Sequence, residues 1–182
     1  WIGTKANGVF YFDGTFWRRY STSNSGIGSN KLRGIVSDGA GGMWFATPKH
    51  VAFLTNNTWV TYSAESYLPG TSELTSVAMD HKGQLWFGTT GNGVLFFDGS
   101  SFHKYPGISE IEVGDITLIR QFSDGRMVVE GSKGIGIKEN DSWKTIPVYP
   151  AVFADLDASG NLWFGNVYGL CCYDGVNAVY LN

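Results

Sequence analysis

The sequence predicts an all-β protein built from repeated four-stranded units. Three observations support this: 25 glycines stand against 5 prolines, aromatic residues make up 15% of the chain, and one short pattern recurs at a nearly constant interval. A chain of 182 residues with this composition is typical of short strands joined by tight turns. The composition is not that of a helical bundle or a disordered segment.

The recurring pattern is Asp-x-x-Gly-x-[Leu/Met]-Trp. It occurs at 38–44, 80–86 and 157–163, in a degraded copy at 122–128 that has Val128 in place of Trp, and as the tail of a further copy at Trp1. These Trp positions are 43, 42, 42 and 35 residues apart. A repeat of roughly 40–45 residues with four strands is typical of the blades of a β-propeller.

Each unit is expected to contain four strands. The first is apolar and β-branched, as at 74–80; the second follows the Asp-x-x-Gly turn and carries the Trp; the fourth opens with an aromatic residue. Both strand faces are apolar, as at 95–97, which suits sheets packed between two neighbours. The third strand usually follows a glycine for which we expect positive φ, namely Gly8, Gly93, Gly134 or Gly169. In the second unit His50 takes the place of this glycine.

The resulting prediction is a β-propeller with four complete four-stranded blades and a three-stranded partial blade. Because no segment supplies the missing inner strand, we expect a portion of a larger ring of about seven blades, for which roughly 290 residues would be needed. A five-bladed ring closed with one three-stranded blade is the alternative. The expected blades span residues 1–20 (partial), 32–62, 74–105, 115–146 and 151–181.

The repeat resembles the two-component regulator propeller family, whose units combine D-x-x-G-x-[LM]-W-[FI]-G-T with G-[VL]-x-x-[FY]-[DN]-G and W-x-x-Y. The best copy runs from Asp80 to Tyr105, and the unit with Val128 departs most. The resemblance implies a periplasmic or extracellular sensor propeller of a bacterial hybrid histidine kinase, one that detects glycans or their breakdown products. This segment itself would then not be an enzyme. Because the motif residues build turns and fill the space between blades, they do not identify a ligand.

The net charge and the hydropathy of the chain argue against nucleic-acid binding and membrane insertion. Thirteen Lys and Arg against sixteen Asp and Glu leave a net charge of -3, so no basic field favours nucleic acid, and no apolar run is long enough to insert into a membrane. Cys171 and Cys172 are interpreted as two small buried side chains. We expect a small-molecule or oligosaccharide ligand, neighbouring blades or domains of the same polypeptide as partners, and a homodimer as one oligomeric state.

A binding site is expected on the face that carries the long, polar connections, namely the loops between second and third strands and those between blades. Aromatic residues could stack on sugar rings there, and Asn, Lys or Arg could donate hydrogen bonds. The ligand-binding candidates are Arg33, Lys49, His50, Tyr67, Thr75, Asn92, Lys133 and Tyr168.

Catalytic and metal sites find little support. His50, His81 and His103 are the only histidines and are scattered over the template, and no H-x-H, H-E-x-x-H or cysteine pair provides metal ligands. We therefore expect no cofactor and no metal. Asp13, Asp98 and Asp174 recur at one template position, which favours turn building over acid–base chemistry. Two alternatives stay open: a lyase or hydrolase similar to streptogramin lyase, with His50 as its histidine, and a secreted lectin-like scaffold.

Overall fold

The computed structural model describes residues 1–105, 114–139, 142–146, 153–166 and 169–181. Within these ranges the chain forms five antiparallel sheets in which the strands pair in chain order. The first sheet holds β1 (Ile2–Gly3), β2 (Val9–Phe12) and β3 (Trp17–Tyr20). The second holds β4 (Gly34–Ser37), β5 (Met43–Ala46), β6 (His50–Thr55) and β7 (Thr58–Ser63).

The remaining sheets repeat the four-stranded design. The third holds β8 (Leu74–Met79), β9 (Leu85–Thr89), β10 (Val94–Phe97) and β11 (Phe102–Lys104), and the short 3₁₀ helix η1 (Glu65–Tyr67) precedes it. The fourth holds β12 (Ile116–Gln121), β13 (Met127–Gly131), β14 (Gly134–Glu139) and β15 (Ser142–Ile146). The fifth holds β16 (Phe153–Leu156), β17 (Leu162–Asn166), β18 (Gly169–Tyr173) and β19 (Ala178–Leu181).

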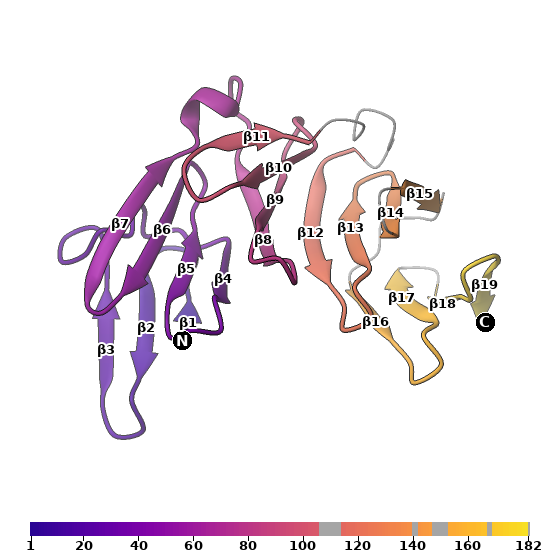
Figure 1. Cartoon of the computed structure of the whole chain (residues 1–182), viewed down its shortest axis with the longest axis horizontal. Helices are drawn as coiled ribbons and strands as arrows, with labels where there is room; N and C mark the ends of the chain where they lie inside the picture. The colour runs from indigo at the N-terminus through magenta and orange to yellow at the C-terminus, as the bar shows by residue number, and fades with distance from the viewer. Residues whose placement is uncertain (106–113, 140–141, 147–152, 167–168, 182) are drawn as a thin grey trace.

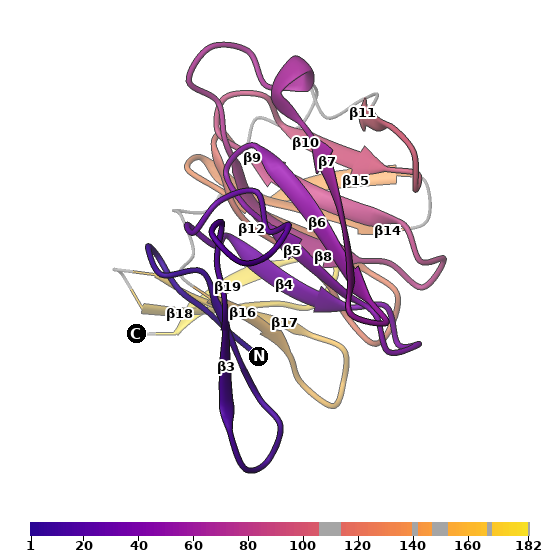
Figure 2. The same cartoon turned by 90° about the vertical axis from the view of Figure 1, so that its left-hand side faces the viewer.

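The sheets follow one another across the molecule in chain order (Figure 1). The first strand of the third sheet, β8, lies against the first strands of both neighbouring sheets, β4 and β12. Viewed from the side of the first sheet, the later sheets stand behind one another with their strands fanned (Figure 2). This radial arrangement confirms the predicted β-propeller with four complete blades and one partial blade. The sheets are called blades 1 to 5 below.

The core of the described residues is divided among the junctions between blades. One buried cluster joins Val9 of blade 1 to Phe45 of blade 2, and a second joins Val51 of blade 2 to Phe87 of blade 3. Two further clusters fill the junctions of blades 3 and 4 and of blades 4 and 5. Burying apolar surface on both sides of each sheet explains why both strand faces are apolar.

The Asp and Trp of the repeat are physically linked. Asp157 Oδ1 accepts hydrogen bonds from the backbone of its own turn, and Oδ2 accepts one from Trp163 Nε1 at 2.8 Å. Asp80 and Trp86 are joined in the same way at 2.9 Å. The bond from Trp163 is the largest of the effects that lower the pKa of Asp157 to about 2. The six-residue spacing of the motif therefore ties the turn to the strand that leaves it in blades 3 and 5.

The glycines before the third strands agree with the expectation except in one blade. Gly8, Gly93 and Gly169 have φ of 79°, 68° and 133°, whereas Gly134 does not have positive φ, which corrects the prediction for that residue. Gly134 pairs with Gly131 across a two-residue connection, and this shorter turn does not need a left-handed residue there. The turn before His50 is also shorter, with Thr47 N–H bonded to the carbonyl three residues later instead of four.

Glu130 departs from the repeat at the position where the second strand otherwise carries a small residue. The equivalent residue in blade 3 is Gly88, which also lies opposite the first strand of its own sheet. The Glu130 side chain is 2% exposed, and its Oε1 has no hydrogen-bond partner. Burial raises the pKa of this carboxyl, and the charge of Arg120 opposes that effect without cancelling it.

Glu130→Gln is expected to stabilise the protein at pH 8 and raise Tm by about 2–4 °C, the shift that about 1 kcal/mol produces in a domain of this size. The pKa of Glu130 is higher in the folded than in the unfolded state. The free energy of unfolding of the wild type therefore falls as pH rises from about 4.5 through the folded pKa. The Tm difference should therefore be absent below pH 4 and grow above it, as measured by calorimetry from pH 4 to 8. A difference that does not vary with pH would contradict this.

Candidate functional site

The structure brings some of the predicted loop residues together. Asn92 donates a hydrogen bond from its amide to the Tyr67 carbonyl at 2.7 Å, and Lys104 Nζ donates to Asn92 Oδ1 at 3.3 Å. Lys49 Nζ lies 3.4 Å from the Gly70 carbonyl in the same connection. These residues hold the loop after η1 against blade 3. Tyr67 is 39% exposed, so one aromatic face remains accessible there.

Arg33 and Thr75 lie near the starts of the first strands of blades 2 and 3. Glu73 accepts hydrogen bonds from Arg33 and from Lys31, the latter at 3.3 Å. Although burial opposes its ionisation, these two cations keep the pKa of Glu73 below its usual value. Arg33 Nε and Thr75 Oγ1 are buried and have no hydrogen-bond partner. Arg33 thus belongs to a charged cluster with Lys31 and Glu73.

His50 and Lys133 do not join the Asn92–Tyr67 contacts or the cluster around Glu73. His50 opens β6, and its backbone bonds to Thr47. Lys133 is exposed in the turn between β13 and β14. Tyr168 lies outside the described residues. The binding role of the eight residues therefore stays a prediction.

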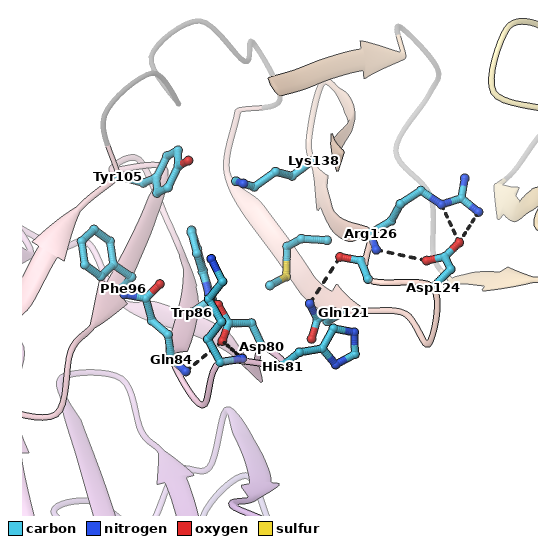
Figure 3. A pocket seen from close by; sticks show the side chains of 13 residues that line it. Asp80, His81, Gln84, Trp86, Phe96, Tyr105, Gln121, Asp124, Arg126 and Lys138 are labelled. Atoms are coloured by element: carbon cyan, nitrogen blue, oxygen red, sulfur yellow. Dashed lines mark hydrogen bonds and ion pairs between the residues drawn. The ribbon is translucent and has the colours of Figure 1, made fainter. Parts of the chain in front are cut away.

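A groove of about 750 Å³ lies between blades 3 and 4 (Figure 3). It is on the face opposite to the long connections. It opens beside the Asp-x-x-Gly turn of blade 3 and the corresponding turn of blade 4, which begins at Phe122. Its lining comprises Asp80, His81, Lys82, Gln84, Trp86, Phe96, Tyr105, Gln121, Asp124, Gly125, Arg126, Met127 and Lys138.

Blade 3 supplies the aromatic side of this groove. Trp86 forms its floor and is 5% exposed, while Phe96 and Tyr105 are half-buried beside it. The ring centroid of Trp86 lies 5.9 Å from that of Phe96 and 5.0 Å from that of Tyr105. The hydrogen bond to Asp80 fixes the Trp86 indole. This aromatic trio comes from β9, from β10 and from the residue that follows β11, and it presents a fixed apolar surface.

Blade 4 supplies the opposite, polar side. Lys138 extends from the end of β14 into the groove toward Tyr105 and Trp86 (Figure 3). Arg126 donates from Nε to Asp124 Oδ2 at 2.7 Å and also reaches the Gly160 carbonyl. Burial opposes ionisation of Asp124, but the hydrogen bonds that Arg126 donates to this carboxylate and the charge of Arg126 outweigh that effect and lower the pKa of the carboxyl. Gln121 donates to the Gly125 carbonyl at 3.3 Å, so this rim is ordered by its own contacts.

Aromatic faces beside amide and ammonium donors can hold a ring that has apolar faces and hydroxyl groups at its edge. The sequence does not predict this groove, because Trp86, Phe96 and Tyr105 occupy repeat positions whose aromatic side chains are expected to fill the space between blades. The signal that could have found it is Lys138: it occupies the third-strand position at which blades 3 and 5 have Phe97 and Tyr173.

The expectation that the recurrent residues Asp13, Asp98 and Asp174 build turns is confirmed. Asp13 Oδ1 accepts backbone N–H bonds from Thr15 and Phe16, and Asp98 and Asp174 do the same in their turns. These backbone bonds are the main reason why the pKa of each of the three carboxyls is lowered. His103 is exposed and lies 2.7 Å from Asp98 Oδ2, away from His50 and His81 in the fold template.

The fold and the groove define the chain as a β-propeller with a ligand-sized cavity between two blades. Residues 67–91 match the model of the family described as two component regulator propeller, which confirms the resemblance in the third repeat. The matched segment includes Trp86 on the groove floor. No curated protein sequence matches the chain.

Solved structures confirm the fold. The extracellular domain of the putative hybrid two component system BT3049 from B. thetaiotaomicron superposes with a TM-score of 0.75 at 24% identity; the match covers 96% of this chain and 26% of that one. A catalytically inactive virginiamycin B lyase from Staphylococcus aureus superposes with a TM-score of 0.73 at 16% identity, and the match covers 98% of this chain and 64% of that one. PorZ of Porphyromonas gingivalis superposes with a TM-score of 0.63 at 16% identity, and the match covers 94% of this chain and 30% of that one. The chain thus spans about a quarter of the BT3049 ectodomain.

Two features are absent from the described ranges. No helix there is long and apolar enough to cross a bilayer. No group of three or more His, Cys, Asp or Glu side chains in the same ranges could hold a metal ion.

Proposed function

We propose that the chain is part of the extracytoplasmic ligand-sensing propeller of a two-component system, and that the groove between blades 3 and 4 binds an oligosaccharide. The observation that carries the proposal is the pairing of a fixed aromatic trio with Lys138 across a cavity of about 750 Å³. The family match at residues 67–91 and the BT3049 ectodomain support the sensor role.

The architecture supports an oligosaccharide over a wholly apolar ligand. A sugar ring could stack on Trp86, Phe96 or Tyr105 through its C–H face, and its hydroxyl groups could meet Lys138 and Gln84 at the rim. The groove also joins two blades. Occupancy would therefore favour one spacing of the blades over others, which is the differential interaction that a sensor needs.

Lys138→Phe is expected to weaken oligosaccharide binding by about tenfold or more, a change of roughly 1.4 kcal/mol. A phenylalanine ring at this position should cover Trp86, as Phe97 covers Trp44 at the preceding junction. The measurement is a glycan-array screen of the intact protein followed by titration calorimetry with the saccharides it binds. Lys133→Phe, which changes an exposed lysine on the opposite face, is the matched control.

The same experiment separates the two faces. Tyr67→Ala should leave binding unchanged if the groove is the site. If Tyr67→Ala abolishes binding while Lys138→Phe does not, the long-loop residues form the site and the groove assignment is wrong. A membrane helix followed by a histidine kinase in the same polypeptide is expected for the sensor role, whereas a natural C-terminus after one more blade would contradict it.

The lyase alternative is favoured by the shared fold of virginiamycin B lyase alone. In the described residues, the ion pair of a histidine with a carboxylate involves His103 and not His50. Hydrolysis or elimination of streptogramin B by the intact protein, lost in His50→Ala, would establish this alternative. The lectin-like scaffold would be supported by glycan binding without any coupled kinase.

A further inference from the structure

A second groove, of about 420 Å³, lies between blades 1 and 2 on the same face as the first. Its lining comprises Trp1, Tyr11, Arg18, Tyr20, Gly41, Met43, Leu54, Thr55, Asn56 and Asn57. Blade 1 provides the aromatic residues and blade 2 provides the opposite side. The groove is therefore built from the same two kinds of blade surface as the groove between blades 3 and 4.

The linings of the two grooves share six positions of the repeat. Trp1, Tyr11 and Tyr20 occupy the template positions of Trp86, Phe96 and Tyr105, as the pairing of Tyr20 with Val9 and of Tyr105 with Val94 shows. The ring centroid of Trp1 lies 4.6 Å from that of Tyr11 and 5.7 Å from that of Tyr20. On the other side, Gly41 and Met43 correspond to Gly125 and Met127, and Leu54 corresponds to Lys138.

The junction of blades 2 and 3 has the same trio but is filled. Trp44 lies 4.3 Å from Phe53 and 6.1 Å from Tyr62 between ring centroids. Phe97, at the position of Leu54 and Lys138, packs its ring 5.8 Å from Trp44 and 4.7 Å from Tyr62. Phe97 is 2% exposed, so it occupies the space that is open at the neighbouring junctions.

The junction of blades 4 and 5 reverses the arrangement. Its trio is aliphatic, with Val128, Ile137 and Ile146, and the facing position carries Tyr173, which is 2% exposed in the same buried cluster. One residue of each following blade therefore decides whether the surface of the preceding blade is covered. Large aromatic residues cover it, whereas Leu54 and Lys138 leave grooves.

We infer that the groove between blades 1 and 2 is a second saccharide site of the same design, and that the residue at the 54/97/138 position determines which junctions bind. This inference rests on the proposed function. The aromatic trio would take the C–H face of a sugar ring, and Arg18, Thr55 and Asn57 would meet its hydroxyl groups.

The test uses the intact protein labelled with 5-fluorotryptophan, whose ¹⁹F resonances are assigned by single Trp→Phe substitutions. The probes are tetrasaccharides of glucose, xylose, mannose or galacturonic acid. Titration with a bound probe is expected to shift the Trp1 and Trp86 resonances, while Trp44, covered by Phe97, serves as the internal control. Leu54→Phe should weaken the Trp1 response by about tenfold and leave the Trp86 response unchanged, and Lys138→Phe should do the reverse.

Each outcome has a separate meaning. A shift of Trp86 without one of Trp1 overturns the second site and leaves the proposed function intact. A shift of Trp44 equal to the other two overturns the covering role of Phe97. No shift at Trp1 or Trp86 with any probe overturns both the second site and the proposed saccharide function. Because the wild-type titration alone gives these results, a variant that fails to fold does not affect the test.

Discussion

Replacing Phe97 with alanine is expected to lower the free energy of unfolding by about 3–5 kcal/mol, the usual cost of removing a buried aromatic ring. The ring lies between blades 2 and 3 and contacts Trp44, Tyr62 and Phe102 at centroid distances of 5.8, 4.7 and 4.9 Å. Its loss would leave a cavity at a junction that cannot close without moving a whole sheet. The measurement is urea unfolding followed by tryptophan fluorescence.

Phe16→Ala is the control for this experiment, because Phe16 is 73% exposed and its removal should cost less than about 1 kcal/mol. Similar losses from the two substitutions would show that Phe97 is not a packing residue. The Phe97 variant should also make Trp44 accessible, so quenching of tryptophan fluorescence by acrylamide should increase in Phe97→Ala and not in Phe16→Ala.

Gly8→Ala is expected to cost about 3 kcal/mol, the sum of two effects. The residue has φ of 79°, which costs a side-chain-bearing residue roughly 1–2 kcal/mol. A Cβ atom there would also lie 2.1 Å from the Tyr20 carbonyl oxygen, so the pairing of β2 with β3 would have to shift, at a further cost of roughly 1–3 kcal/mol.

Gly39→Ala separates the two effects. Gly39 has φ of 74°, and no neighbouring atom lies within 4 Å of the place that an added methyl group would take. Only the backbone cost therefore applies, and a loss of about 1–2 kcal/mol is expected. Both variants would be compared by calorimetric Tm and urea midpoint. Equal losses at the two glycines would mean that the contact with Tyr20 relaxes freely.

The architecture could be predicted because the residues that define it act over short distances in the chain. Asp157 binds its own turn and the indole of Trp163, so the spacing that the sequence shows is the spacing that the hydrogen bonds require. Asp98 likewise accepts hydrogen bonds from the backbone N–H groups of Ser100 and Ser101. Repetition of such local units at about 42 residues left few alternatives to radial sheets.

The groove could not be predicted in the same way because it depends on pairs of residues from different units. Trp86 and Trp44 have the same motif and the same aromatic neighbours, yet one faces Lys138 and the other faces Phe97. Their difference becomes visible only when the side of β10 and β14 that faces the preceding blade is known. Gly134 shows the same limit for turns, since a connection shortened to two residues changed the backbone that its position requires.

The division of the buried residues into four separate clusters has a consequence for how this protein can change. Each cluster is confined to one pair of adjacent sheets, so the energetic effect of a substitution should be felt by that pair and hardly at all by the others, as in a one-dimensional array with nearest-neighbour coupling. Recognition properties could therefore diversify at one seam during evolution while the remaining seams preserve the fold.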